Sequence, residues 1–404
     1  MKKRTIAKTG ATMLTMAMLL NGTTVFADGT NYGSQIDGLK TTTFDKYLVM
    51  DKQANVPNAS FTYEVNAGSA KAYDVAGKKV QILTGVDADK VIMKGVGTDA
   101  AKTIKYAPGD DVAQGVNALV KNYDSTTEKY AKKTATLDFS ACNFTEPGIY
   151  RYIITENNTN QQAITYDADL TRVLDVYVED ASTETEKKLT IAGYVLHSSE
   201  SDIAAGDDLG SDGTDPDGKS QGFTNEYDTS DLTFKKKVDG NQASHDKYFE
   251  FTVTITDAVP GTVYDVNLLN ADATSKSNAA TITENAGKTN PDKLTVGTDG
   301  TVTRKFYLQH GQEITIQGIA KKSKYSVTEK AEDYKSTEAG VADYTAPVKG
   351  TIESADLKTS YLNTRKGTVP TGVIMTVAPF AAVTLLGAAG MVTIKMRKKE
   401  DDAE

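Results

Sequence analysis

Apolar and polar residues alternate with a period of two in many short stretches of this chain. The clearest stretches are Phe61, Tyr63 and Val65; Tyr150, Tyr152 and Ile154; Leu174, Val176 and Val178; Phe249, Phe251, Val253 and Ile255; and Ile314 and Ile316. Successive side chains of a strand point to opposite faces, so this alternation is typical of half-buried β-strands. No stretch has the period of a long amphipathic helix. The pattern predicts an all-β chain, most economically two tandem immunoglobulin-like β-sandwich domains, although periodicity alone does not separate a sandwich from a barrel.

Both ends of the chain depart from the strand pattern. Residues 1–27 carry early basic residues, an apolar stretch and small residues before position 28, which predicts a secretory signal peptide. Residues 373–394 form an apolar run long enough to cross a bilayer, and the basic cluster after it favours the cytoplasmic side. We therefore expect an exported chain whose C-terminal end is held in the membrane. An ordinary single-span anchor is the alternative reading of that end.

The stretch between the two ends is long enough for two domains. Turn-forming residues just after Tyr227 place the boundary between a first domain, 28–228, and a second, 229–367, followed by the C-terminal segment 368–404. The net charge is −9, and removal of the four positive charges of residues 1–27 makes the exported part more acidic still. An acidic balance favours solubility and argues against a nucleic-acid partner.

Cysteine and metal-ligand patterns exclude two common means of stabilising an exported domain. Cys142 is the single cysteine, so the chain forms no internal disulfide, and a buried, inert thiol is the expected role. The acidic segment 205–218 lacks the residues of a calcium-binding loop at its first and twelfth positions. We expect no metal and no cofactor.

A weak internal repeat places three polar residues at corresponding positions of the two domains. Each domain has a Lys on its first strand, a Glu on a late strand and an Asn on its last strand: Lys46, Glu156 and Asn225, then Lys236, Glu329 and Asn363. All six share the strand parity of their apolar neighbours, which predicts that they point into the core. The alternative is that they are surface or capping residues whose parity matches by chance.

Burial of these residue types together has a chemical consequence. Desolvation lowers the pKa of a buried Lys and raises that of a buried Glu, so the amine becomes a neutral nucleophile and the acid a proton donor. Attack of the Lys amine on the Asn carboxamide, with loss of ammonia and with Glu moving the protons, would form an intramolecular amide. Glu156 and Glu329 are thus the candidate catalytic residues.

Four motifs resemble those of one protein family. They are Tyr-Ser-Val-Thr-Glu at 325–329, Phe-Thr-Asn at 223–225, Val-Leu-Asp-Val-Tyr-Val at 173–178, and Val-Pro-Thr-Gly at 369–372 with its spacing from Asn363. The chain resembles the major, or T-antigen backbone, pilins of Gram-positive bacteria over nearly its whole exported length. The resemblance implies immunoglobulin-like domains, each with a spontaneous Lys-Asn isopeptide bond. Here the bonds would join Lys46 to Asn225 with Glu156, and Lys236 to Asn363 with Glu329.

The C-terminal tail resembles a cell-wall sorting signal, in which a sortase cleaves after Thr and transfers the acyl group to an amine. The motif Val369, Pro370, Thr371 and Gly372 departs from the common Leu-Pro-any-Thr-Gly form, because Val precedes Pro and no residue separates Pro from Thr. The resemblance also implies an acceptor lysine shortly before the last strand of the first domain. Lys219 is the candidate, and a solvated loop lysine is its alternative role.

These implications describe a structural protein: the shaft subunit of a covalent pilus at the cell surface, with chemistry directed only at itself. Its expected partners are other copies of itself, a pilus sortase, and possible accessory pilins and peptidoglycan, with no host ligand identified. A monomeric wall-anchored adhesin built from the same cross-linked domains is the alternative. An enzyme acting on an external substrate is disfavoured, because His197, His245 and His310 are scattered and no paired catalytic motif accompanies them.

Overall fold

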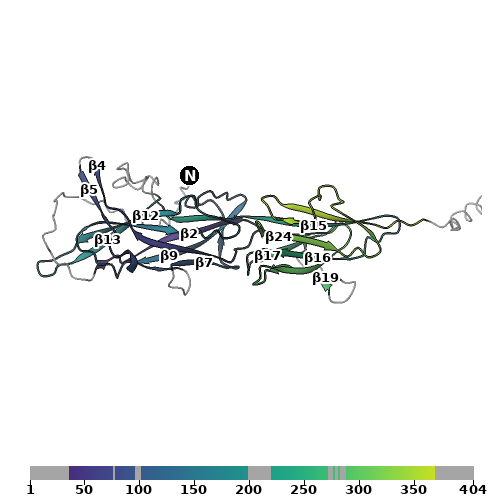
Figure 1. The fold of residues 1–404 in the computed structure, drawn as a ribbon, viewed down its shortest axis with the longest axis horizontal. Coiled ribbons are helices and arrows are strands. Elements are labelled where there is room, and N and C mark those ends of the chain that lie inside the picture. Colours follow the sequence, from purple (N-terminus) through teal and green to yellow (C-terminus); the bar gives the residue numbers. More distant parts are fainter. Residues whose placement is uncertain are drawn as a thin grey trace, which may run out of the picture.

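The computed structural model describes residues 36–75, 78–95, 102–198, 220–271, 276–277, 281–282 and 288–368. Within them the chain forms two β-rich halves that lie end to end along the long axis of the molecule (Figure 1). The predicted signal peptide, Lys219, and residues 369–372 with the apolar run after them lie outside the described residues. The described part contains one short 3₁₀ helix, η1 (Ala88–Lys90), and no helix with the length and apolar character needed to span a bilayer.

The first half is a sandwich of two sheets. The described strands of the larger sheet are, in spatial order, β1 (Asp37–Gly38), β13 (Leu189–His197), β12 (Thr171–Asp180), β10 (Gly148–Glu156), β3 (Ala59–Ala67) and β7 (Thr103–Tyr106), with β5 (Lys78–Thr84) on β10 and β4 (Lys71–Val75) on β5. Those of the smaller sheet are β11 (Ile164–Thr165), β14 (Gly222–Tyr227), β2 (Thr41–Asp51), β9 (Glu128–Asp138) and β6 (Ile92–Lys94), with β8 (Val112–Ala113) on β9.

The second half repeats this arrangement. One sheet contains β18 (Lys276–Ser277), β17 (Val263–Leu269), β23 (Glu313–Ala320), β15 (Thr229–Asp239), β27 (Leu357–Thr364) and β25 (Lys335–Glu338), with β21 (Lys293–Thr295) on β17. The facing sheet contains β22 (Val302–Leu308), β16 (Phe249–Thr256), β24 (Lys324–Glu329) and β26 (Lys349–Thr351). A small two-stranded pair, β19 (Thr281–Ile282) and β20 (Lys288–Thr289), forms no strand pairing with either sheet. The all-β prediction is confirmed.

Strand alternation builds the core of each sandwich. On β3 and β16 every second residue is buried, which places their aromatic and branched side chains between the sheets. Phe44 on β2 meets Tyr63 on β3 edge to face, with ring centroids 5.2 Å apart, and Phe234 on β15 meets Phe251 on β16 at 5.5 Å. Corresponding aromatic contacts therefore join the two sheets of each half, with favourable ring geometry.

The outer face of β2 is also buried, which the period-two pattern did not predict. Tyr47 and Val49 point away from the main core and pack with Tyr130 of β9 and Val120 of the preceding loop. That loop therefore covers the outside of the smaller sheet. Side chains on both faces of β2 are therefore buried.

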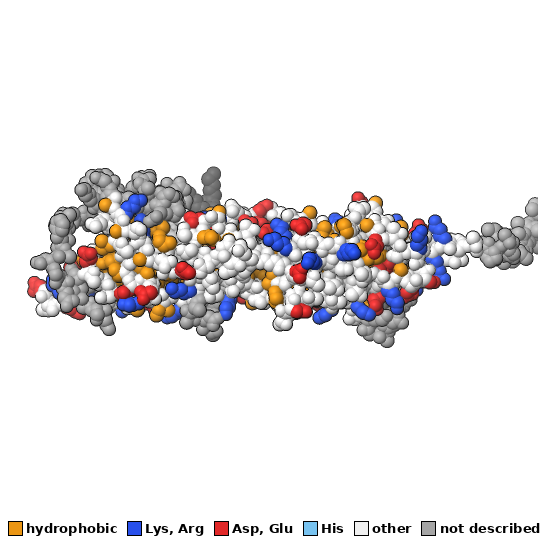
Figure 2. Space-filling view, viewed as in Figure 1, with side chains coloured by type: hydrophobic (Ala, Val, Ile, Leu, Met, Phe, Trp, Pro, Cys, Tyr) orange, Lys and Arg blue, Asp and Glu red, His pale blue; other side chains and the backbone are white. Residues whose placement is uncertain are grey.

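The two halves are joined through a short connection with several direct contacts. Only Asp228 separates β14 from β15. The side-chain amide of Asn55 donates to Val263 O at 3.1 Å, and that of Gln162 donates to Lys321 O at 3.1 Å. Ala320 packs with the core of the first half. These contacts from separate loops fix the angle between the halves and give the elongated outline of Figure 2.

Candidate functional site

In the first half, a parallel strand pair brings Lys46 and Asn225 together. β14 runs parallel to β2, and Phe223 is the register partner of Lys46, so Asn225 lies two residues further along and on the same face. Glu156 ends β10 in the facing sheet, where it pairs with Tyr63. The three side chains thus come from the long strand β2 near the start of this half, from β10 in its middle and from its last strand, β14, and they meet between its sheets.

The contacts within this first cluster are short. Lys46 Nζ lies 2.7 Å from Glu156 Oε1 and donates to Oε2 at 2.9 Å. Asn225 Nδ2 donates to Glu156 Oε1 at 3.0 Å. Lys46 and Asn225 are fully buried, and Glu156 is 1% exposed. The carboxylate therefore bridges the amine and the carboxamide in a site closed to solvent.

The second half repeats the cluster with the same strand offset. β27 runs parallel to β15, Tyr361 is the register partner of Lys236, and Asn363 lies two residues further along. Lys236 Nζ forms an ion pair with Glu329 Oε1 at 2.5 Å. Asn363 Nδ2 donates to the same oxygen at 3.1 Å. The side chains of Lys236 and Glu329 have no exposed surface.

Burial controls the charge state of both lysines. Loss of solvent lowers the pKa of Lys46 to about 8, against the opposing attraction of Glu156. The same desolvation lowers the pKa of Lys236 to about 8, opposed by Glu329. Each amine also lies over an aromatic ring, Phe61 at 4.6 Å and Phe249 at 4.2 Å from the centroid. A substantial neutral fraction near pH 8 makes each amine a nucleophile beside a carboxamide.

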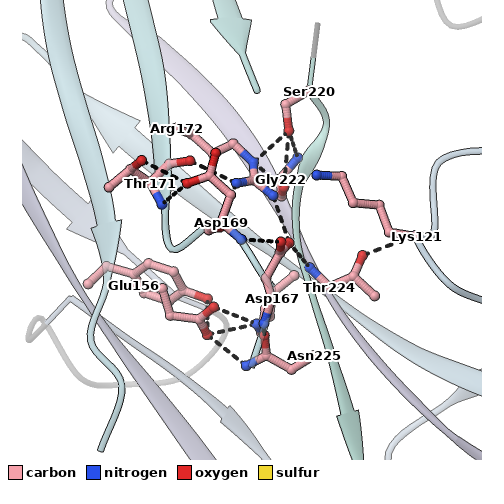
Figure 3. A network of polar contacts seen from close by, with 12 residues as sticks. Lys121, Glu156, Asp167, Asp169, Thr171, Arg172, Ser220, Gly222, Thr224 and Asn225 are labelled. Atoms are coloured by element: carbon pink, nitrogen blue, oxygen red, sulfur yellow. Dashed lines mark hydrogen bonds and ion pairs between the residues drawn. The ribbon is translucent and has the colours of Figure 1, made fainter. Parts of the chain in front are cut away.

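Sequence reasoning missed a polar network beside the first cluster (Figure 3). Asp167 receives a hydrogen bond from Arg172 Nη2 at 2.7 Å, and its own main-chain N–H donates to Asn225 Oδ1 at 2.9 Å. The signal was present, because Arg172 has the strand parity of Leu174 and Val176, whose inward orientation the alternation predicts. In the second cluster, the hydroxyl of Ser336 donates to Glu329 Oε2 at 3.0 Å.

The remaining candidates fall into two groups. Lys219 and residues 369–372 lie outside the described residues. Cys142 is buried and unpaired, and burial raises the pKa of its thiol to about 12, which leaves it in the unreactive protonated form. In the described ranges, no three His, Cys, Asp or Glu side chains are arranged to hold a metal ion.

Two family models and a known protein match this chain in sequence. Residues 42–228 match the family described as "Spy0128-like isopeptide containing domain", and residues 230–365 match "Domain of unknown function (DUF7601)". A protein named "Pilin" from Streptococcus pyogenes serotype M1 is 25% identical over 415 residues, which cover 98% of this chain and 99% of that protein. The chain is therefore similar to a streptococcal pilin over nearly its whole length.

Solved structures similar to this chain include streptococcal proteins. The crystal structure of the major pilin from Streptococcus pyogenes has a TM-score of 0.49 at 18% identity, covering 82% of this chain and all of that one. The major pilin T3.2 from serotype GAS13637 of the same species has a TM-score of 0.47 at 20% identity, covering 83% of this chain and all of that one.

Proposed function

We propose that this chain is the repeating shaft subunit of a covalent pilus, and that each half is closed by a spontaneous isopeptide bond. Lys46 would be joined to Asn225 with the help of Glu156, and Lys236 to Asn363 with the help of Glu329. The observation that carries the proposal is the repetition: two buried Lys-Glu-Asn clusters with the same strand offset. The likeness to a streptococcal pilin over nearly the whole chain supports the polymer.

The geometry supports a balanced reaction in each half. Lys46 gives a proton to Glu156 and becomes a neutral amine, which attacks Cγ of Asn225. The new C–N bond forms as the bond from Cγ to Nδ2 breaks, and one amine proton travels through Glu156 to the departing nitrogen. Ammonia leaves, and an amide remains between the two side chains. Glu156 contacts both nitrogens, as a proton carrier between them must.

The position of the bonds gives them a mechanical role. Each would join the first strand of a half to its last strand, which closes a long loop and restricts the unfolded chain by about 5 kcal/mol in the chain-entropy model. A tensile force entering at one end of a half would pass through the covalent bond. The bonds would thus replace the disulfides that a chain with a single cysteine does not form.

Assembly would use the two candidates outside the described residues. The Thr371 acyl group would pass, through a sortase, to the amine of Lys219 in a neighbouring copy, and the segment from Gly372 onward would be released. The peptide bond between Thr371 and Gly372 breaks and a new amide forms at Lys219. Only the basal copy would then be attached to the cell wall.

Intact mass measurement of recombinant residues 28–368 tests the cross-links. We expect a mass lower than that of the translated sequence by two molecules of ammonia, with cross-linked peptides joining strand β2 to β14 and strand β15 to β27. A mass equal to that of the translated sequence would refute both bonds.

Denaturing gels of cell-wall extracts test the polymer separately. A ladder of high-mass species that collapses to one band in a Lys219→Arg variant supports the shaft subunit and its acceptor. A single monomeric band from the wild-type chain would favour the wall-anchored adhesin.

A further inference from the structure

The oxygen atom and the nitrogen atom of the Asn225 carboxamide have different hydrogen-bond partners. Its Nδ2 atom points to Glu156, while its Oδ1 atom accepts the main-chain N–H of Asp167 at 2.9 Å (Figure 3). Attack on Cγ moves an electron pair onto Oδ1, which becomes an oxyanion. A donor already aimed at that oxygen stabilises the transition state without reorganisation.

We propose that the main-chain N–H of Asp167 is the oxyanion donor for formation of the Lys46–Asn225 bond, and that Arg172 is the positioning residue that holds it. This inference rests on the proposed isopeptide chemistry and assigns to it a group outside the Lys-Glu-Asn cluster. Glu156 and Asp167 then have separate roles at Asn225. Glu156 moves the proton from Lys46 Nζ to Nδ2, and the main-chain N–H of Asp167 stabilises the charge on Oδ1.

Several buried hydrogen bonds hold Asp167 in this position. Its Oδ2 atom accepts from Arg172 Nη2 at 2.7 Å and from the main-chain N–H of Thr224 at 3.0 Å. Its Oδ1 atom accepts from the main-chain N–H of Asp169 at 3.1 Å. Thr224 precedes Asn225, so one carboxylate fixes both the donor segment and the strand that carries the acceptor.

Arg172 also forms a hydrogen bond with the start of the last strand, β14. It is fully buried beneath the core aromatic residues, with its guanidinium 4.5 Å from the ring centroid of Phe223. Its Nε atom donates to Gly222 O at 2.8 Å, and its Nη1 atom donates to Asp169 O at 2.8 Å. A planar guanidinium with several fixed donors can make these contacts at once, and a lysine ammonium cannot.

The second cluster has no corresponding donor to the side-chain oxygen of its Asn among the described residues. No residue in the described ranges donates a hydrogen bond to Asn363 Oδ1, although Asn363 Nδ2 contacts Glu329 as Asn225 Nδ2 contacts Glu156. The network is therefore not a requirement of the shared cluster geometry. It is an addition specific to the first half.

Replacing the main-chain amide of Asp167 by an ester removes the N–H donor and keeps the side chain. The α-hydroxy acid analogue of Asp can be placed at 167 by nonsense suppression in cell-free synthesis, with samples quenched over time and both cross-linked peptides quantified by mass. We expect the Lys46–Asn225 bond to form at least about 100-fold more slowly, while the Lys236–Asn363 bond of the same molecules keeps its rate. A first-half rate within about threefold of the wild-type rate would overturn the inference. Absence of both bonds in the wild-type chain would instead refute the proposed cross-links.

Side-chain variants test the positioning role if the ester prevents folding. Asp167→Asn and Arg172→Lys should each slow the Lys46–Asn225 bond by about tenfold. Asp175→Asn is the matched control, because Asp175 is a buried aspartate that accepts from Arg151 at 2.8 Å, and it lies on the face of β12 opposite Arg172. Equal slowing in Asp167→Asn and Asp175→Asn, or none in either, would contradict the positioning role.

A spectroscopic measurement separates polarisation from simple loss of stability. In a Lys46→Met chain, which cannot react, the ¹³C shift of the Asn225 side-chain carbonyl reports the hydrogen bond to Oδ1. We expect Asp167→Asn to move this resonance upfield and Asp175→Asn to leave it in place. An unchanged resonance in both would count against Asp167 as the donor.

Discussion

Lysine is among the residues least often found fully buried, yet Lys46 and Lys236 have no exposed surface. Each retains one carboxylate partner and one aromatic ring in place of water. A buried charged pair gains little net stability, because desolvation offsets the attraction. The buried pair has a chemical role here, because the same desolvation that disfavours the charged amine favours its neutral, nucleophilic form.

Glu329→Gln should prevent the second cross-link, because a glutamine keeps the shape of the side chain but cannot carry the proton. We expect a mass lower than that of its own translated sequence by one ammonia instead of two, and a free energy of unfolding of the second half lower than the wild-type value by about 5 kcal/mol. Glu313→Gln is the control, since Glu313 pairs with neighbouring Lys235 at 3.1 Å outside the cluster. Loss of both ammonias in Glu329→Gln would contradict the assigned role.

An unreacted Lys46 should make stability depend on pH. In an Asn225→Ala chain the folded state has a Lys46 pKa of about 8, lowered by burial from the ordinary value of 10.5. Between these two values the unfolded state binds more protons, so the free energy of unfolding rises with pH, by up to about 3 kcal/mol in total. Below about pH 8 both states are protonated and this dependence vanishes. Denaturant titrations at several pH values should show the rise in Asn225→Ala and not in a chain that also carries Lys46→Met.

At the scale of elements, the parallel pairing of first and last strands decides which residues meet. Lys46 and Lys236 each stand two register positions before the Asn of the neighbouring strand. A lysine side chain is long enough to cover that offset between strands about 4.8 Å apart. Strand parity predicted the inward direction of all six side chains. The register, which no local pattern encodes, brought them into contact.

The joint between the halves depends on a close backbone approach. Gly318 has a φ of +64°, and a Cβ there would lie 2.5 Å from Ala54 Cα. Gly318→Ala should therefore lower the free energy of unfolding by about 1–3 kcal/mol through overpacking and loosen the joint. Gly115→Ala is the control, because Gly115 also has a positive φ but open space around it. Small-angle scattering should show a broader distribution of lengths for Gly318→Ala alone; identical profiles would argue against a close-packed joint.

At the scale of the whole molecule, the two cross-links and the joint would act in series along the rod (Figure 1). A force applied at residues 36 and 368 would pass across the first bond from Lys46 to Asn225. It would then follow β14, Asp228 and β15 to Lys236, and cross the second bond to Asn363. Most of both sandwiches would then carry none of it. The connection between the bonds is short because β15 begins at Thr229, directly after Asp228.

Single-molecule pulling between those two points tests this path. The wild-type chain should extend only by the short segments outside the bonds, with no unfolding step of either half. A chain with Glu156→Gln and Glu329→Gln should show two long steps, because the sheets then carry the force. Long steps in the wild-type chain would contradict the series arrangement.

The sequence by itself determined the all-β class and the inward orientation of Lys46 and Asn225, because period-two alternation is a local consequence of strand geometry. It also pointed to Glu156 by the same parity. Tertiary structure alone decided the covered outer face of β2, the strand register and the hydrogen-bond partners of Asp167 and Arg172. These depend on which strands become neighbours and on loops that fold over a sheet. Such contacts between distant segments leave no periodic trace in the chain.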